Sequence, residues 1–320
     1  MPIIPSDFRP PWFLRNGHVQ TILQPLLPRS ISISFQRERW ELPDGDFLDL
    51  DWARSGRRRL AILSHGLEGS SADDCIRGLA AALVADGWDA LAWNLRGCGG
   101  EPNRLPRFYH GGESADLAAV VNYAAPGYSS IAVIGLSLGG NITLKYLGEG
   151  RVHPAIVAGA GISVPVDLAA SSRALDSQWA NSIYLRRLIT RLLAKVRAKA
   201  EQFPDLFDPA VAENVRTFAE FDGRYTAPLH GFRDARDYWT RASSRQFLPR
   251  ITVPTLLLNA RNDPFLAPEC FPFSEAHLNP ALFLETPFSG GHLGFLDFSR
   301  GFNPWSERRI VQFLASPGRA

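Results

Sequence analysis

Residues 131–148 read IAVIGLSLGGNITLKYLG, and this stretch decides the fold. Ile131 to Ile134 form a short apolar run, which is typical of a buried strand. Leu138 to Gly148 have the pattern of a helix. Between them, Gly135-Leu-Ser-Leu-Gly139 fits the pattern G-x-S-x-G, which places a serine on a sharp turn from a strand into a helix. The stretch therefore predicts a strand, a tight turn and a helix in direct succession.

Short apolar strands alternate with helices on both sides of this stretch. Strands are predicted over 60–64, 90–93, 155–158, 255–258 and 281–284, and helices over 72–86, 113–125 and 304–314. Upstream, Ile31–Leu42 and Phe47–Trp52 alternate around the turn signal Pro43-Asp-Gly45, which indicates an antiparallel hairpin. The order predicts an α/β fold with a mostly parallel central sheet and helices on both faces.

The alternation predicts one domain over 1–320 with one insertion. The core covers about 30–163 and 251–320, and residues 1–30, rich in proline and aromatic residues, form an extended arm. Residues 164–250 have helical patterns and no convincing strand, so we expect a helical cap. Ligands of open α/β sheets bind at the carboxyl ends of the strands, and an insertion that leaves from such an end would cover that site.

The composition excludes several classes of protein. In 320 residues, 45% are hydrophobic and 21% are charged, as in ordinary globular proteins, and the net charge of +2 argues against nucleic-acid binding. Three scattered cysteines with no CxxC spacing argue against a disulfide framework and against a zinc site. We therefore expect no cofactor and no metal. There is no signal peptide pattern and no apolar run long enough to span a membrane, so we expect a cytoplasmic protein, by default a monomer.

Ser137 is the candidate nucleophile. The turn strains this serine and exposes its Oγ, and the following helix directs free N–H groups at a developing oxyanion. One oxyanion donor is then the N–H of Leu138, and the second is the N–H of Leu67, in the loop His65–Gly69 after the strand 60–64. His65 is interpreted as a residue that shapes this loop. The alternatives are a glycine-rich turn with an incidental serine and a plain strand-to-helix loop.

The acid and the base follow from chain order, which in such folds is serine, carboxylate, histidine. Asp263 follows the strand 255–258, and His292 follows the last strand in a glycine-rich loop. Asn262 competes for the acid position, but an amide cannot stabilise an imidazolium by charge. Asp263 could instead be a turn residue. Of the other histidines His277 is the strongest competitor, but it precedes the last strand.

These motifs and several others resemble the YheT-type branch of the α/β-hydrolases, which includes yeast medium-chain acyl-CoA:ethanol acyltransferases and relatives of animal lipid-cleaving hydrolases. The resemblance spans roughly residues 8 to 300. Its motifs are Asn16–Thr21, His65–Ser70, Arg96–Arg104, Tyr109–Glu113, Asp222–Phe232 and Asn259–Pro264. The resemblance implies hydrolysis of carboxylic esters, with an acyl ester or lipid-like small molecule as substrate. The alternatives are an acyl-CoA:alcohol acyltransferase and an inactive hydrolase scaffold used for binding.

Two further features each allow two interpretations. Residues 183–203 form an amphipathic helix with an arginine-rich face, which either is simply solvated or makes peripheral contact with anionic lipid. The Arg96–Arg104 stretch is either a buried loop held by arginine hydrogen bonds or a clamp for a substrate anion.

Overall fold

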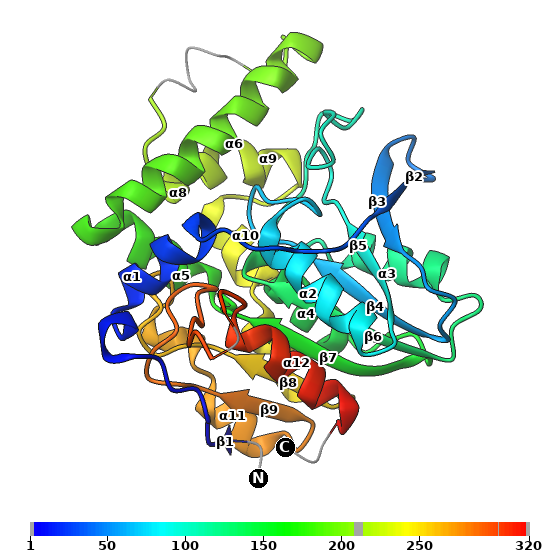
Figure 1. Ribbon diagram of the computed structural model, residues 1–320. Coiled ribbons are helices and arrows are strands. Elements are labelled where there is room, and N and C mark those ends of the chain that lie inside the picture. The colour runs from blue at the N-terminus through cyan, green and yellow to red at the C-terminus, as the bar shows by residue number, and fades with distance from the viewer. Residues whose placement is uncertain (1–2, 208–213, 300, 318–320) are drawn as a thin grey trace.

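A nine-stranded sheet runs through the centre of the molecule (Figure 1). The computed structural model describes residues 3–207, 214–299 and 301–317. The strands are Ile3–Ile4 (β1), Gln36–Glu41 (β2), Phe47–Ala53 (β3), Arg59–Ser64 (β4), Asp89–Trp93 (β5), Ser130–Leu136 (β6), Ile156–Ile162 (β7), Thr255–Leu258 (β8) and Leu282–Glu285 (β9). Their order is β1-β9-β8-β7-β6-β4-β5-β3-β2. Among the described strands the β2–β3 and β3–β5 pairings are antiparallel and the other six are parallel, so the sheet is mostly parallel, as predicted.

Helices cover both faces of the sheet (Figure 1). They are Gly17–Leu23 (α1), Asp74–Ala85 (α2), Ser114–Ala124 (α3), Leu138–Gly148 (α4), Leu168–Ser177 (α5), Ser182–Gln202 (α6), Phe218–Phe221 (α8), Ala227–Leu229 (α9), Ala235–Ala242 (α10), Phe273–Leu278 (α11) and Trp305–Ala315 (α12). Helices α2 and α12 pack on one face, and α3 and α4 on the other. The predicted α/β class is confirmed.

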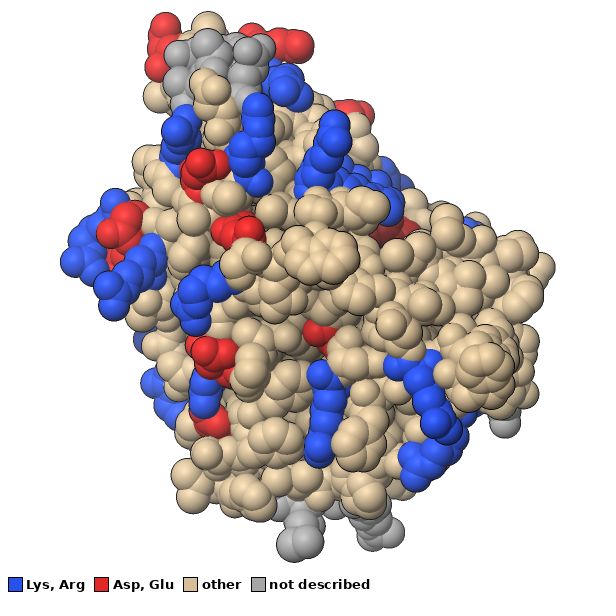
Figure 2. All heavy atoms as spheres, turned by 90° about the vertical axis from the view of Figure 1, so that its left-hand side faces the viewer, with Lys and Arg blue, Asp and Glu red and all other residues tan. Residues whose placement is uncertain are grey.

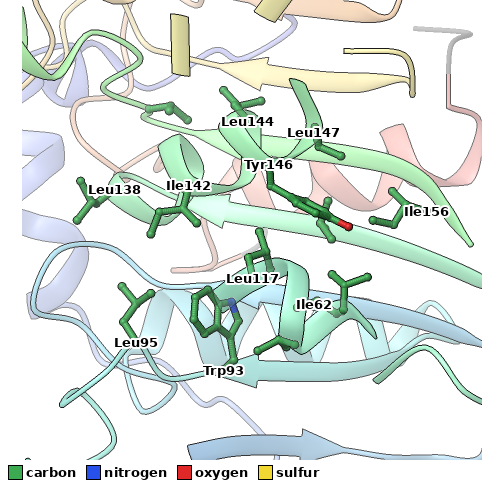
Figure 3. Packing of buried hydrophobic residues seen from close by; sticks show 14 of the residues in the cluster. Ile62, Trp93, Leu95, Leu117, Leu138, Ile142, Leu144, Tyr146, Leu147 and Ile156 are labelled. Atoms are coloured by element: carbon green, nitrogen blue, oxygen red, sulfur yellow. The ribbon is translucent and has the colours of Figure 1, made fainter. Parts of the chain in front are cut away.

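The core on the α3 and α4 face explains why the strands are apolar on both sides. Ile62 on β4 and Trp93 on β5 are buried beneath Leu117 of α3, with Ile142 and Tyr146 of α4 beside them (Figure 3). Burying each such aliphatic or aromatic side chain contributes roughly 1.5–3 kcal/mol before entropy is subtracted. A separate apolar cluster lies on the opposite face, against α2 and α12. Because a central strand is buried on both faces, its residues do not alternate between apolar and polar.

The N-terminal segment differs from the extended arm that we predict. Ile3 and Ile4 pair in parallel with β9 and add a strand at the sheet edge, and the segment then forms a helix, α1. The hairpin strand also begins at Gln36 instead of Ile31, because Ile33 and Phe35 pack against the α2 side of the core. The apolar residues of the proline-rich segment 1–30 are isolated and show no periodic pattern, so the sequence predicted neither β1 nor α1.

Between β7 and β8 the described residues are helical and contain no strand. This segment contains α5, α6, α8, α9 and α10, and α6 is its longest helix. Helix α6 buries one stripe, including Ile189, Leu192 and Val196, and leaves Arg186 and Arg187 exposed. The segment lies beyond the carboxyl ends of the strands (Figure 1). The division into core, cap and arm remains a prediction. The helices between β7 and β8 lie at the position expected for the cap, beyond the carboxyl ends of the strands (Figure 1).

Candidate active site

The turn between β6 and α4 carries Ser137. Its backbone has φ 51° and ψ −120°, a conformation that a non-glycine residue adopts only when its surroundings enforce it. The N–H of Ser137 donates to the Ile162 carbonyl on β7, and the Ser137 carbonyl accepts the Gly140 N–H. A Cβ atom on Gly135 would lie 2.2 Å from the Gly139 carbonyl oxygen, so only glycine lets the turn close. Ser137 is thus fixed at the N-terminus of α4.

Three side chains from separate loops form one hydrogen-bonded line. His292 Nε2 lies 2.9 Å from Ser137 Oγ, and His292 Nδ1 lies 2.8 Å from Asp263 Oδ2. The Asp263 side chain, after β8, is completely buried, and the His292 side chain, after β9, is 8% exposed. A buried carboxylate that accepts from Nδ1–H fixes the tautomer in which Nε2 can take a proton from the serine. The structure therefore brings together the three residues that chain order predicts.

The loop after β4 lies against the serine. A Cβ atom on Gly66 would be 3.3 Å from Ser137 Cβ. Leu67 and Leu138 line the same cavity as Ser137 and His292. Among the described residues, no backbone hydrogen bond uses the N–H of Leu67 or of Leu138. Both N–H groups are therefore available beside the serine, where oxyanion donors are needed.

His65 gives this loop its shape. Its Nε2 accepts the Leu95 N–H at 3.1 Å, so the neutral ring carries its proton on Nδ1, which donates to the Gly66 carbonyl at 2.7 Å. The side chain is buried, and burial lowers its pKa to about 4. Tyr109 holds the other end of the loop, because its hydroxyl accepts the Glu68 N–H and donates to the Glu68 carboxylate. His65 thus acts as the predicted loop-shaping residue.

A cavity of about 270 Å³ opens from Ser137 and His292 towards the helices between β7 and β8. Its apolar wall comes from α5, α6 and α8 and includes Leu168, Leu175, Leu188, Leu192, Phe218 and Phe221. Asp222 is a buried acid of this wall, with its two oxygens bonded to the Thr226 hydroxyl at 2.6 Å and the Trp239 indole N–H at 2.7 Å. Burial raises the pKa of Asp222 to about 6 although these bonds lower it. The cavity is therefore mainly apolar, with its reactive groups at one end.

The N-terminal helix α1 holds the loop that carries His292. Thr21 Oγ1 accepts the His292 N–H at 2.8 Å and donates to the Gly17 carbonyl at 2.7 Å. Gly17 itself packs on the loop of the acid, because a Cβ atom there would lie 1.9 Å from the Asn262 carbonyl oxygen. Helix α1 is therefore fitted against the loops of both the base and the acid.

Two further side chains secure the loop after His292. Gln20 is fully buried and makes a pair of hydrogen bonds with the Leu296 backbone, donating to its carbonyl at 3.1 Å and accepting its N–H at 2.8 Å. Ser163, directly after β7, accepts the Leu293 N–H at 3.0 Å. These contacts join residues far apart in the chain, so no local pattern could have shown them.

A row of aromatic rings connects His292 to the segment above it. Phe265 stacks on the His292 ring with 4.1 Å between centroids, and Tyr184 of α6 meets the far side of Phe265 edge-on at 5.0 Å. His18 of α1 stacks on Tyr184 and lies 3.2 Å from its hydroxyl through Nδ1. Sequence reasoning assigned no role to Phe265 or Tyr184, although Phe265 directly follows the Asn259–Pro264 motif. The row fixes the plane of the imidazole.

Buried Arg96 and Asn103 anchor the Arg96–Arg104 stretch, whereas residues 100–102 and Arg104 are exposed. Arg96 is buried and donates to both oxygens of Asp116 at 2.7 and 2.8 Å and to Asp46 at 3.0 Å. Arg104 pairs with Glu41 on the exposed rim of the hairpin. These guanidinium groups are thus directed at carboxylates of the protein itself, which favours a structural loop over a clamp for a substrate anion.

The model of the alpha/beta hydrolase fold family matches residues 62–299, which include the serine, the acid and the base. The chain belongs to the alpha/beta hydrolase fold family. Within that family, YheT of Escherichia coli (strain K12) is 34% identical over 97% of this chain and 94% of its own length, which places the chain in the YheT-type branch. The phospholipase ABHD3 of Mus musculus is 29% identical over 92% of this chain and 75% of its own length.

The solved structure of the esterase Pf2001 of Pyrococcus furiosus has the same hydrolase fold. Its TM-score to this chain is 0.58, at 18% identity over 90% of this chain and 95% of that chain. At this identity the likeness shows the fold alone.

Among the described helices, none combines the length and the apolar character that crossing a membrane requires.

Histidine and acidic side chains also gather away from the serine. Within the described residues, His110, Glu113 and His230 form the one group of three or more such side chains that could hold a metal ion, which opposes the expectation of no metal. The expectation that the protein binds no cofactor stays a prediction.

Proposed function

We propose that the protein hydrolyses carboxylic esters, with Ser137 as nucleophile, His292 as general base and Asp263 as the acid that orients the base. The observation that carries this proposal is the continuous hydrogen-bonded line from Asp263 through His292 to the Ser137 hydroxyl. This line ends at a mainly apolar cavity, which suits an acyl group or another apolar part of an ester. A relative named as a phospholipase supports the same class of reaction.

The reaction follows from the positions of these groups. Ser137 Oγ attacks the ester carbonyl while His292 Nε2 takes the hydroxyl proton, and Asp263 stabilises the resulting imidazolium. The N–H groups of Leu67 and Leu138 bind the oxyanion, and each such donor is worth about 2.7–4 kcal/mol in the transition state. His292 then returns the proton to the departing alcohol. Water, activated by the same imidazole, releases the acid from Ser137 and restores the enzyme.

Labelling with a fluorophosphonate probe tests this assignment together with hydrolysis of p-nitrophenyl esters of increasing chain length. We expect the probe on Ser137, and a loss of at least roughly 10⁴-fold in kcat in Ser137→Ala with the fold intact. The exposed Ser129→Ala is the matched control and should keep both labelling and activity. Full activity of Ser137→Ala would contradict the proposal. An unlabelled, inactive wild-type protein would favour a binding scaffold instead.

The same acyl-enzyme can transfer its acyl group to an alcohol in place of water. The resemblance to ethanol acyltransferases makes this the second candidate function. Product analysis after adding ethanol separates the two functions, because a transferase yields the ethyl ester in excess of the free acid. We expect the free acid to dominate.

We also propose that the face formed by the N-terminal segment and the start of α6 makes peripheral contact with an anionic membrane. Trp12 and Trp179 are 79% and 88% exposed, and Ile183 of α6 is 71% exposed next to the exposed Arg186 and Arg187. Figure 2 shows this side of the molecule, where Lys and Arg side chains lie scattered over a mostly uncharged surface. Tryptophan beside arginine is the pattern of interfacial binding to anionic lipid.

Co-sedimentation with vesicles tests this contact. We expect binding to vesicles that contain phosphatidylglycerol and weaker binding to pure phosphatidylcholine, with a loss in Trp179→Ala. Leu278, 82% exposed on α11, supplies the control Leu278→Ala. Equal binding by both variants, or none by the wild type, would contradict the contact.

A cytoplasmic location fits the three unpaired cysteines, and a monomeric state stays a prediction.

A further inference from the structure

A second group of reactive side chains lies away from Ser137, between the core and the helical segment. His110 and Glu113 come from the loop before α3, and His230 follows α9. One ligand atom from each lies within 4.8 Å of the other two. His110 Nε2 is 3.3 Å from Glu113 Oε2, and the rings of His110 and His230 have centroids 4.5 Å apart. The hydrolase reaction uses none of these residues.

Two of these atoms are buried without a hydrogen bond. Glu113 Oε2 and His230 Nε2 have no hydrogen-bond partner among the described residues, and the Glu113 side chain is only 7% exposed. An unpaired buried polar group destabilises the fold, more so if it is charged, so such groups call for an explanation.

His230 has a buried ring nitrogen without a hydrogen-bond partner among the described residues, as a metal ligand requires. Metal-bound histidines usually donate their second ring N–H to a carbonyl or a carboxylate, which directs the free lone pair at the metal. In His230 the buried Nε2 has no hydrogen bond within the described part of the chain, so it is available to a metal, and a ligand atom of His230 lies within 4.8 Å of those of His110 and Glu113. Glu113 contributes the oxygen ligand.

We propose that His110, Glu113 and His230 bind a divalent transition-metal cation, with Zn²⁺ as the best match. Two imidazoles and one carboxylate are a ligand set that zinc accepts, at about 2.0–2.2 Å from the metal. Ligand atoms of a tetrahedral zinc site are then about 3.3 Å apart. The pair formed by His110 and Glu113 already has this spacing, and the His230 side chain needs to close by about 1.5 Å at most.

An open coordination position lies on the solvent side. A cavity of about 850 Å³ is bordered by all three residues, so water can complete the coordination. Imidazole ligands disfavour Mg²⁺, which prefers oxygen. Lys145 and Arg241 also border this cavity, and Arg107 Nη1 lies 3.8 Å from Glu113 Oε2. Arg107 already pairs with Asp44 at 2.8 Å, so it can leave Glu113 to a cation.

Binding carries one local cost. The Gly112 N–H donates to His110 Nδ1 at 3.0 Å, so the neutral ring holds its proton on Nε2. Ligation through Nε2 moves this proton to Nδ1 and breaks the bond from Gly112. The metal must therefore compensate for one backbone hydrogen bond that is lost at His110.

The site would join two parts of the chain at the wall of the catalytic cavity. His230 belongs to the helical segment between β7 and β8, and Glu113 adjoins core helix α3. His110 borders both the second cavity and the cavity of Ser137. A bound cation therefore fixes the helical segment against the core, and we expect it to stabilise the fold without taking part in ester cleavage.

Zinc uptake by the chelator-treated, full-length protein tests the proposal. After dialysis against ZnSO₄ and then buffer, we expect elemental analysis to find about one zinc per chain and thermal denaturation to show a raised Tm; MgCl₂ should do neither. His230→Ala and Glu113→Gln should retain no zinc above background. The exposed His277→Ala is the matched control and should retain it like the wild type. Far-ultraviolet circular dichroism confirms that each variant is folded.

Cobalt spectroscopy provides a measurement that does not depend on variants. Co²⁺ bound by two imidazoles and a carboxylate gives visible d–d bands, which addition of Zn²⁺ should abolish. Absence of such bands and of zinc uptake in the wild type would overturn the proposal. Zinc uptake by His230→Ala equal to that of the wild type would overturn it as well, because the metal would then be bound elsewhere.

Discussion

The turn at Ser137 and the N-terminal segment both position the catalytic groups, but they do so in opposite ways. The turn is built from consecutive residues, since Gly135 and Gly139 come within contact distance of each other and Ser137 lies between them. The N-terminal segment acts across more than 200 residues, by placing Thr21 beneath the backbone of His292. The nucleophile is therefore positioned locally and the base by a distant part of the chain.

This difference decides what a substitution does in each region. A substitution in the turn disturbs the junction of β6 and α4 in the middle of the sheet, so it destabilises the whole fold. A change in α1 leaves the sheet intact and alters the loop of the base. Substitutions in the turn should therefore lower the free energy of unfolding, and substitutions in α1 should lower kcat.

The largest expected effect is that of Gly135→Ala. The added Cβ atom would lie 2.2 Å from the Gly139 carbonyl oxygen, which cannot move without distorting α4, so we expect a loss above about 4 kcal/mol in the free energy of unfolding. Urea denaturation, or recovery of soluble protein, measures this loss. In the control Gly223→Ala the new atom meets nothing within 4 Å, and stability should stay within about 0.5 kcal/mol. Equal stability of the two variants would refute the local account.

The sequence predicted the parts of the site that depend on local rules. The strand, turn and helix around Ser137, and the loops of Asp263 and His292 after successive strands, follow from chain order and periodicity. The supports of His292 do not, because Thr21, Ser163 and Phe265 contact it or its loop only through tertiary packing. For the same reason no sequence pattern predicts that His230 lies beside His110.

An intermediate effect comes from pH, through His65 beside the serine. Its pKa falls from 6.5 to about 4 on folding, because burial disfavours the charged ring. The unfolded chain therefore takes up a proton first as pH falls, and the stability that this group contributes above pH 6.5 is lost towards pH 4. Between pH 7 and pH 5 the loss is about 2 kcal/mol.

Urea denaturation at the two pH values, compared between wild type and His65→Gln, isolates this contribution. The variant should lose less stability than the wild type between pH 7 and pH 5, although it is less stable at pH 7 because the Leu95 N–H loses its acceptor. His277→Gln, at an exposed position, should keep the wild-type dependence. An unchanged pH dependence in His65→Gln would show that other groups cause the loss.

The smallest effect is expected for Thr21→Val, which tests the distant support directly. Valine keeps the shape of threonine but cannot accept the His292 N–H, so the base becomes less well held while the cavity keeps its walls. A lost hydrogen bond of about 1 kcal/mol corresponds to a roughly fivefold fall in kcat, with KM nearly unchanged. Thr21→Ser retains the hydroxyl and should restore kcat. If Thr21→Ser lowered kcat and Thr21→Val did not, packing of the Thr21 methyl group would matter and the hydrogen bond to the base would not; if neither variant lowered kcat, α1 would be a structural element without influence on the reaction.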